Sequence, residues 1–297
     1  MTKSLSIIIP TKDRCETLKQ LLVSIKELKG LERIQPEIIV GENGSKDDTW
    51  AMLQEEASQF PVRLHTLRVN RPGKCAVLNE AIRVVRGELV ALLDDDVLLD
   101  PGWLEAIEAF FRENDYPAAQ GVVRIQSPDS EDPEILTLLQ RYRTIPHVEY
   151  SPDAKEVHSL NGANMVIHRK VFTQVGDFDE RLGPGASGTS EDVELALRLT
   201  RRGIKIGYIN NAIVYHSVDR SRLTEAYFKL IHKRQGQSRL LFKNPRTGRI
   251  LWDFARAAAQ YGLHSLTGSE RKKYRGKGRV YHYLGMLEIK LKPGGKG

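Results

Sequence analysis

Three consecutive aspartates, Asp94, Asp95 and Asp96, follow the apolar residues 89–93 of the 297-residue chain. Carboxylates this close together repel one another and resist the loss of their water. Residues i and i+2 of an extended segment point the same way, so Asp94 and Asp96 can face one site while Asp95 turns away. Two carboxylates aimed at one point favour a hard divalent cation. A strand that simply leaves the core in acidic residues is the alternative that this segment leaves open.

Two further groups could take part in chemistry. Glu191 and Asp192 stand at the start of a helical pattern, residues 190–203. Acids at a helix N-terminus are stabilised by the helix dipole, so helix capping is the simpler interpretation of this pair when it is taken alone. His216 ends an apolar stretch, and a lone histidine is more often structural than a metal ligand.

The first hundred residues alternate between strand and helix patterns, which implies an α/β layer with a largely parallel sheet. Ligands of such sheets bind beyond the carboxyl ends of the strands. We expect strands at residues 4–10, 37–41, 62–69 and 89–94, and helices at residues 16–28, 45–58, 73–87 and 100–114. Polar or unusual residues stand at the expected strand ends: Pro10, Thr11, Glu42, Asn43, Asn70, Arg71 and the three aspartates.

The pattern becomes less regular after residue 117. We expect strands at residues 118–126, 161–169, 204–209 and 212–218, with an irregular segment over residues 127–157. The rest is predicted to be mainly helical, with helices at residues 223–242, 250–263 and 280–291 and a polar link at residues 268–279.

Charge divides the chain unevenly. Residues 1–200 hold 23 Lys and Arg against 33 Asp and Glu, whereas residues 201–297 hold 22 against 5. A basic segment is often only a solvated surface, but it can also contact phosphates, an acidic polymer or a membrane. None of the apolar runs approaches the roughly 18 residues of a membrane span, and we read no signal peptide. The two cysteines form no metal or redox motif, so we expect a cytoplasmic protein, with the inner face of the membrane as an option.

Five segments in order resemble a family 2 glycosyltransferase with a GT-A fold. They read SIIIPTKDR, EIIVGENGSKDDT, NRPGKCAVLNEAI, LVALLDDDVLLDPGWL and NGANMVIHRKVFTQVGDFDERLGPGASGTSEDVELALRL. The resemblance implies a GT-A catalytic domain over residues 1–217, with a nucleotide-binding half (1–100) and an acceptor-binding half (101–217). Residues 218–297 would form a basic helical C-terminal extension, whose first helix resembles an Arg-rich helix of bacterial members.

The resemblance assigns the aspartates to a DxD motif. It implies that Asp96 ligates Mn²⁺ or Mg²⁺ directly, that Asp94 lies near the metal and the ribose, and that Asp95 belongs to the nucleotide-sugar site. His216 would complete the metal shell, and an imidazole suits Mn²⁺ better than Mg²⁺. A divalent cation would stabilise the charge that develops on the leaving diphosphate.

The other site residues carry over by the same resemblance. Asp192 would be the base that deprotonates the acceptor hydroxyl, and Glu191 would hydrogen-bond the acceptor. Glu42 stands where the family usually has an aspartate that contacts the base or ribose. The remaining expected contacts to the nucleotide sugar are Pro10, Thr11, Arg14, Asn43, Arg71 and Lys74. Arg220, Arg222, Arg234 and Gln235 could close over the diphosphate, or could simply line a solvated helix.

These features together predict a metal-dependent transferase. It would move a sugar from a nucleoside diphosphate, with UDP favoured, to a glycan or lipid-linked acceptor in polysaccharide synthesis. Inverting transfer is favoured, with retaining transfer as the near alternative. A nucleotidyltransferase would need a Gly-rich loop after the first strand, and a non-catalytic binding module would lack the base or the ligands. The basic tail could cover the donor, grip an anionic glycan or contact a membrane, and no nucleic acid partner is expected.

Overall fold

The computed structural model describes residues 3–126, 129–266 and 268–292, and the chain divides into two compact units. The sheet unit consists of Met1–Gln126, Pro146–Glu180 and Glu191–Ser217. The helical unit consists of Ser127–Ile145, Arg181–Ser190 and Val218–Gly297. The catalytic-domain boundary expected after residue 217 stays a prediction.

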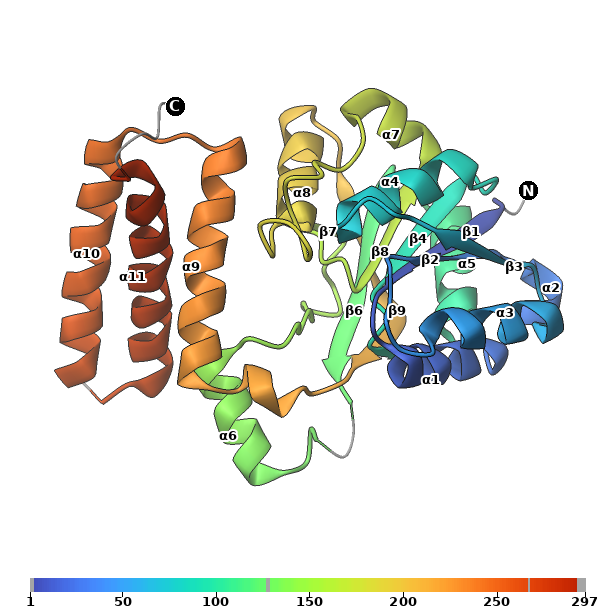
Figure 1. The fold of residues 1–297 in the computed structure, drawn as a ribbon, viewed down its shortest axis with the longest axis horizontal. Coiled ribbons are helices and arrows are strands. Elements are labelled where there is room, and N and C mark those ends of the chain that lie inside the picture. Colours follow the sequence, from blue (N-terminus) through green and yellow to red (C-terminus); the bar gives the residue numbers. More distant parts are fainter. Residues whose placement is uncertain (1–2, 127–128, 267, 293–297) are drawn as a thin grey trace. The chain divides into compact units, whose positions relative to one another are not determined.

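The sheet unit is built on one mixed sheet whose strands follow the order β3-β2-β1-β4-β8-β6-β9-β5, with β7 paired to β9 (Figure 1). The strands β1 to β4 pair in parallel, and β6 pairs in parallel with β9. The strand β8 runs antiparallel between β4 and β6. The strands are β1 (Leu5–Thr11), β2 (Glu37–Glu42), β3 (Leu64–Arg68), β4 (Leu89–Leu93), β5 (Val97–Leu99), β6 (Ala118–Ile125), β7 (Glu156–Val157), β8 (Asn164–His168) and β9 (Ile206–His216).

Helices cover both faces of this sheet, because its strands are apolar on both sides. Ile7 and Ile9 of β1 face one core with α1, α3 and α5, whereas Ile8 faces a second core with α4, α7 and α8. The helices of the sheet unit are α1 (Cys15–Lys26), α2 (Leu31–Ile34), α3 (Thr49–Gln59), α4 (Lys74–Val84), α5 (Trp103–Glu113), α7 (Arg169–Val175) and α8 (Glu191–Arg201). The expected fold, a mostly parallel α/β sheet flanked by helices, is confirmed.

The helices α2 and α7 and the strands β5 and β7 were not expected from the sequence, and two predicted segments are organised differently. The helix expected from residue 45 begins at Thr49, because the backbone before it is held by side chains instead: Lys46 N donates to Asp13, and Thr49 N donates to Asp47. The two strands expected at residues 204–209 and 212–218 form one strand, β9, whose pairing with β6 shifts register after Gly121.

The helical unit contains α6 (Pro133–Tyr142), α9 (Glu225–Phe242), α10 (Thr247–Leu266) and α11 (Glu270–Lys290), with a short 3-10 turn at Arg220–Arg222. The helix α11 packs against both α9 and α10 (Figure 1). Rings of Tyr142, Phe228 and Tyr274 pack together where α6, α9 and α11 meet. The C-terminal helical extension expected from the sequence is confirmed.

The polar link expected at residues 268–279 is wrong, because α11 already begins at Glu270. Glycines within such a polar segment are a local signal for a loop. Gly278 instead lies against the ring of His232, where a Cβ would come within 2.5 Å of Nε2. The glycine therefore serves a close contact between helices. None of the helices in the described residues is long and apolar enough to cross a membrane.

Candidate active site

The expected site residues converge at the carboxyl edge of the parallel strands. Thr11 ends β1 and Glu42 ends β2, and the two are register partners. The aspartate triplet follows β4 directly, and β4 pairs in parallel with β1. His216 reaches this edge from β9, where it is the register partner of Val97 in β5. The topology therefore brings together residues that are far apart in sequence.

Asp94, Asp96 and His216 form a cluster that could hold a metal ion. One ligand atom from each side chain lies within 4.8 Å of the others. His216 is buried, whereas the two aspartates are partly exposed, so the cluster opens towards solvent on its acidic side. Arg14 lies beside it, with its Nη1 atom 3.6 Å from Oδ2 of Asp96.

The orientation of the His216 ring fits a metal ligand. Its Nδ1 atom lies 2.7 Å from the carbonyl oxygen of Ser217, which can only accept a hydrogen bond. In the neutral ring, Nε2 therefore carries the lone pair, and Nε2 lies 3.4 Å from Oδ1 of Asp96. Two acceptors that face each other need a proton or a cation between them. Two carboxylates and one imidazole are ligands that a divalent metal ion can accept.

Asp95 turns away from this cluster, although the extended segment expected here is a turn: β4 ends at Leu93, β5 begins at Val97, and Asp95 and Asp96 lie in the turn between them. Its Oδ2 atom accepts a hydrogen bond of 2.7 Å from the hydroxyl of Thr11. Burial, together with the neighbouring charge of Asp96, raises the pKa of Asp95 to about 7. Asp95 thus connects the aspartate triplet to the end of β1.

Lys74 joins the aspartate triplet to the second acidic pair. Its ammonium lies 2.5 Å from Oδ1 of Asp94 and 3.2 Å from Oε1 of Glu191. Burial alone would lower the pKa of Lys74, but the charges of Asp94 and Glu191 outweigh it and hold the pKa well above its usual value. Lys74 is therefore charged and bridges the start of α4, the end of β4 and the start of α8.

Asp192 lies beside this bridge. Its carboxylate accepts hydrogen bonds from the backbone N–H groups of Val193 at 2.7 Å and Gly162 at 3.3 Å. Burial, reinforced by the charge of Glu191, raises the pKa of Asp192 to about 7. A carboxyl group with such a pKa can accept a proton near neutral pH, which is what a general base requires.

The sequence analysis did not single out Gly162, which forms part of the wall between these acids. A Cβ atom at this position would lie 2.9 Å from Nζ of Lys74 and 3.9 Å from Oδ1 of Asp94. Even the smallest side chain would therefore displace the ammonium. The Asn-Gly pair at residues 161–162 is a turn signal that could have drawn attention to this segment.

A buried polar network holds that turn in place, and the sequence analysis missed it. The side chain of Gln120 accepts from Asn161 N at 2.6 Å and donates to Asn164 O at 2.9 Å. The Asn164 amide donates to the carbonyls of Val122 and Ala212 and accepts from the indole of Trp103 at 3.0 Å. A glutamine inside the apolar stretch 118–123 was the available signal.

Glu42 is fully buried at the end of β2. Its Oε1 atom accepts a hydrogen bond from Ser45 N. Its Oε2 atom lies 3.3 Å from Nε of Arg68 but accepts no hydrogen bond from the residues that the structure describes. A buried acceptor without a hydrogen bond is costly, so this oxygen is suited to a donor from a ligand.

Three residues expected at the nucleotide-sugar site have other contacts. The side chain of Asn43 is fully used by the backbone of residues 69–73, since it donates to Val69 O and Arg71 O and accepts from Gly73 N. Arg71 forms ion pairs with Glu80 and Glu180. Pro10 lies within β1 as the register partner of Gly41.

The basic residues that follow β9 belong to the helical unit. Arg220 lies 3.5 Å from a carboxylate oxygen of Asp132, and Arg222 donates to the carbonyl of Thr144. Gly188 lies close to the Arg234 side chain. Gln235 is part of α9 and is half-buried. A role for these four residues at the diphosphate stays a prediction.

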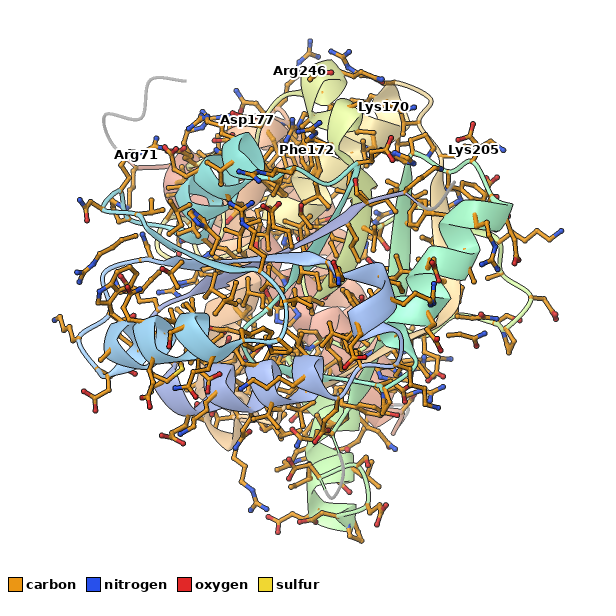
Figure 2. All side chains as sticks on the ribbon, turned by 90° about the vertical axis from the view of Figure 1, so that its right-hand side faces the viewer. Arg71, Lys170, Phe172, Asp177, Lys205 and Arg246 are labelled. Atoms are coloured by element: carbon orange, nitrogen blue, oxygen red, sulfur yellow. The ribbon has the colours of Figure 1, made fainter. Side chains whose placement is uncertain are left out.

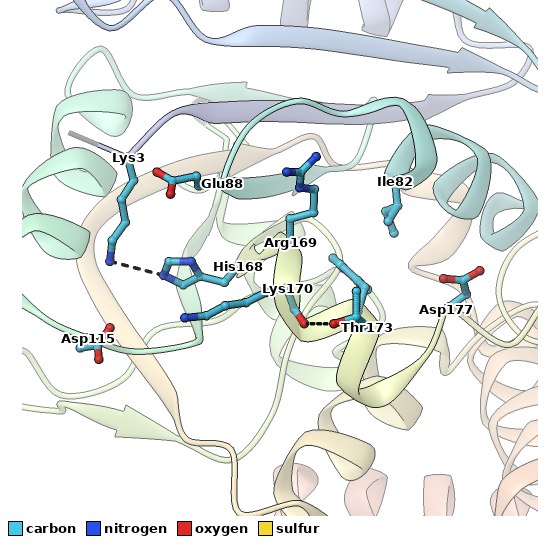
Figure 3. Close-up of a pocket in the computed structure, with 10 residues that line it drawn as sticks. Lys3, Ile82, Glu88, Asp115, His168, Arg169, Lys170, Thr173 and Asp177 are labelled. Atoms are coloured by element: carbon cyan, nitrogen blue, oxygen red, sulfur yellow. Dashed lines mark hydrogen bonds between the residues drawn. The ribbon is translucent and has the colours of Figure 1, made fainter. Parts of the chain in front are cut away.

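A separate hollow of about 740 Å³ lies at the opposite edge of the sheet (Figure 3). Its lining includes Lys3, which precedes β1, and His168, which pairs with the first residue of β4. Lys170, Phe172 and Asp177 also line it, and Figure 2 labels these three side chains on the ribbon. Its charges are of both signs and none of the expected site residues lines it, so it is distinct from the candidate site.

Comparisons with known proteins agree on the type of domain. The family model described as glycosyltransferase like family 2 matches residues 3–236. The chain is 24% identical over 241 residues to the O-antigen biosynthesis protein RfbC of Myxococcus xanthus, an alignment that covers 76% of this chain. It spans 18% of that relative's length and less than half the length of other curated relatives.

Two solved structures share the fold. One is the mannosyltransferase PcManGT from Pyrobaculum calidifontis in complex with GDP-Man and Mn²⁺, with a TM-score of 0.64, 16% identity and coverage of 98% of this chain and 88% of the other. The other is S. aureus TarS 1-349 in complex with UDP-GlcNAc, with a TM-score of 0.56, 14% identity and coverage of 95% and 91%.

Proposed function

The chain belongs to the glycosyltransferase like family 2, and we propose that it transfers a sugar from a nucleoside diphosphate to an acceptor hydroxyl. The acceptor would be a glycan or a lipid-linked glycan of polysaccharide synthesis. The observation that carries the proposal is the Lys74 bridge between Asp94 and Glu191. This bridge brings the cluster of Asp94, Asp96 and His216 close to Asp192, whose pKa is near neutrality. Transfer of a sugar from a diphosphate needs both a cation site and a base.

Asp94, Asp96 and His216 would hold Mn²⁺ or Mg²⁺ in this proposal. The geometry of the three ligand atoms and the Nε2 lone pair support that assignment. When bound, the cation would stabilise the negative charge of the leaving diphosphate. Lys74 and Arg14 would add fixed positive charge on the same side.

Asp192 would take the proton of the acceptor hydroxyl. Its raised pKa supports this role, because a base with a pKa near 7 is half deprotonated at neutral pH. The hydrogen bonds from Gly162 and Val193 would fix its direction. Glu191 would hold the acceptor. A base on the side opposite the leaving diphosphate gives inversion at the anomeric carbon, and retention is the competing outcome.

The nucleotide would lie over the ends of β1 and β2. The Oε2 atom of Glu42, which lies 3.3 Å from Nε of Arg68 without a hydrogen bond from it, could accept a hydrogen bond from a base N–H. Uracil and guanine both carry an N–H group next to a carbonyl, so this contact alone admits UDP and GDP. Of the two, we favour UDP. Asn43 would act by positioning residues 69–73. Pro10 and Thr11 would form the surface on which the nucleotide lies.

The domain assignment completes the proposal. Residues 1–217 would form the catalytic domain, with the nucleotide in residues 1–100 and the acceptor against residues 101–217. Residues 218–297 would form the basic extension.

A panel of UDP-, GDP- and CDP-sugars with Mn²⁺ tests the proposal by ³¹P and ¹H NMR, with monosaccharides and short glycans as acceptors. We expect release of one nucleoside diphosphate, a glycoside of inverted anomeric configuration, and loss of both in Asp192→Asn. Formation of pyrophosphate from a nucleoside triphosphate and a sugar phosphate would indicate a nucleotidyltransferase instead. A product with retained anomeric configuration would contradict the assignment of Asp192 as the base.

A further inference from the structure

Helix α10 carries an apolar surface that none of the described residues of the helical unit covers. Eight residues on one side of the helix are exposed and lack a polar side chain: Gly248, Leu251, Trp252, Ala255, Ala259, Gly262, Leu263 and Leu266. At 3.6 residues per turn they span an arc of about 120° along the whole helix. We call this surface the α10 stripe. Trp252 is 66% exposed and Leu266 is 88% exposed.

Core packing does not explain the stripe. The helix has a second apolar side, on which Ile250 is buried against Met286 and Leu287 of α11. That side supplies the contacts that hold α10 in its bundle. The stripe faces away from them, so its tryptophan and leucines are not needed for the fold of the helical unit. An exposed apolar surface of this size indicates a partner.

The charges around the stripe indicate what that partner is. Residues 218–297 hold 19 Lys and Arg against 5 Asp and Glu. Arg249 and Arg256 run along one side of the stripe, where they share Asp253. Exposed cations also stand at both ends of α10: Lys243 and Arg246 precede it, and Arg271, Lys272 and Arg275 follow it. Within the described residues, none of these five has a carboxylate partner.

We propose that the α10 stripe docks on the surface of an anionic phospholipid bilayer. The helix would lie in the plane of the interface, with Trp252 and the leucines among the acyl chains and glycerol groups and the cations on lipid phosphates. The helix is also too polar to cross a bilayer. A second copy of the chain is a poorer occupant, because it would bring the same uncompensated positive charge to the contact. The inference does not depend on the proposed transfer reaction.

Co-sedimentation of the full chain with vesicles tests this inference. One set of vesicles contains phosphatidylcholine alone and the other also contains about 30% phosphatidylglycerol. We expect at least tenfold stronger partition to the anionic vesicles, and a steep decrease as NaCl rises from about 0.1 M to about 0.5 M. The double variant Leu263→Glu/Leu266→Glu should partition about tenfold more weakly. Leu230→Glu on α9, at a position 43% exposed, is the matched control and should bind like the wild type.

Tryptophan fluorescence provides a second test, which does not depend on the folding of the double variant. Trp103 is fully buried and Trp50 is half-buried under Arg68, whereas Trp252 is exposed, so the emission of Trp252 should shift to the blue on anionic vesicles. Trp252→Phe should remove that shift while preserving the circular dichroism spectrum. Absence of vesicle binding, equal loss in Leu230→Glu, or binding that ignores salt and lipid charge would overturn the proposal. So would a concentration-dependent dimer in ultracentrifugation that Leu263→Glu/Leu266→Glu abolishes without any vesicle binding.

Discussion

The ammonium of Lys74 lies 2.5 Å from a carboxylate oxygen of Asp94. The two residues come from the start of α4 and the end of β4, and the same ammonium also contacts Glu191 at the start of α8. One cation therefore holds together two acidic motifs that are about a hundred residues apart in the sequence. Several properties of the candidate site depend on this contact.

Replacing Lys74 by methionine should lower both activity and stability. The variant leaves Asp94 and Glu191 without their shared cation, which should cost about 3 kcal/mol of unfolding free energy at neutral pH. Because the folded-state pKa of Lys74 is raised, its contribution is present below the pKa of the unfolded lysine and is lost only at higher pH. Urea titration at pH 7, together with turnover of the donor, measures both effects.

Lys19→Met on the exposed side of α1 is the matched control for that variant. It should change the unfolding free energy by less than about 0.5 kcal/mol. An equal effect of the two substitutions would contradict a specific role for the Lys74 bridge.

The rate of transfer should depend on pH through Asp192. Burial and the charge of Glu191 raise its pKa to about 7, and a base works only when deprotonated. The value of kcat/KM should therefore decrease about tenfold per pH unit below about pH 7 and level off above it. Asp192→Asn should remove this pH dependence and reduce kcat by a factor of about 100 or more. If kcat/KM instead decreased only below about pH 4, the transition would belong to another carboxylate with an ordinary pKa.

Gly162→Ala should impair the site while leaving the fold intact. The new methyl group would displace the Lys74 ammonium, the far end of a flexible side chain, so the backbone need not move. We expect at least a tenfold decrease in kcat/KM with a melting temperature close to that of the wild type. Gly262→Ala in α10, where a Cβ meets nothing within 4 Å, should leave kcat/KM unchanged and should not lower the melting temperature. A loss of stability in Gly162→Ala that exceeds the loss in Lys74→Met would show that the turn itself cannot accept a side chain.

Asn164→Ala should destabilise the sheet unit. It leaves the carbonyls of Val122 and Ala212 and the indole N–H of Trp103 without partners in the core. We expect a loss of about 2–4 kcal/mol by denaturant titration. Asn210→Ala, which removes one exposed hydrogen bond to Pro152, should cost less than about 1 kcal/mol. Similar losses in the two variants would mean that the buried network contributes no more than a surface hydrogen bond.

The local patterns of the sequence were enough to predict the type of sheet. The alternation of Ile7, Ile8 and Ile9 places side chains in two cores, and this follows from strand geometry without knowledge of the rest of the fold. Asp95 does lie apart from Asp94 and Asp96, but Asp95 and Asp96 belong to a turn, so the i, i+2 rule of an extended segment is not the reason.

Features that depend on distant partners could not be predicted in this way. Gly278 has the local signature of a helix break, yet its role is set by His232 on another helix. Asn43 stands at a strand end like the binding candidates, but its amide is satisfied by residues 69–73. Gln120 and Asn164 acquire their importance only when β6 and β8 pair. In each case a tertiary contact decides what the local pattern leaves open.

In the proposed function, Asp94, Asp96 and His216 form a metal-dependent nucleotide site. Calorimetric titration of UDP, GDP and CDP with and without Mn²⁺, for the wild type and Asp96→Ala, measures whether this site exists. We expect that one nucleotide binds only with Mn²⁺ and that Asp96→Ala abolishes this binding while its melting temperature stays close to that of the wild type. Binding that is indifferent to Mn²⁺ and to Asp96, or no binding of any of the three nucleotides with Mn²⁺ present, would contradict it.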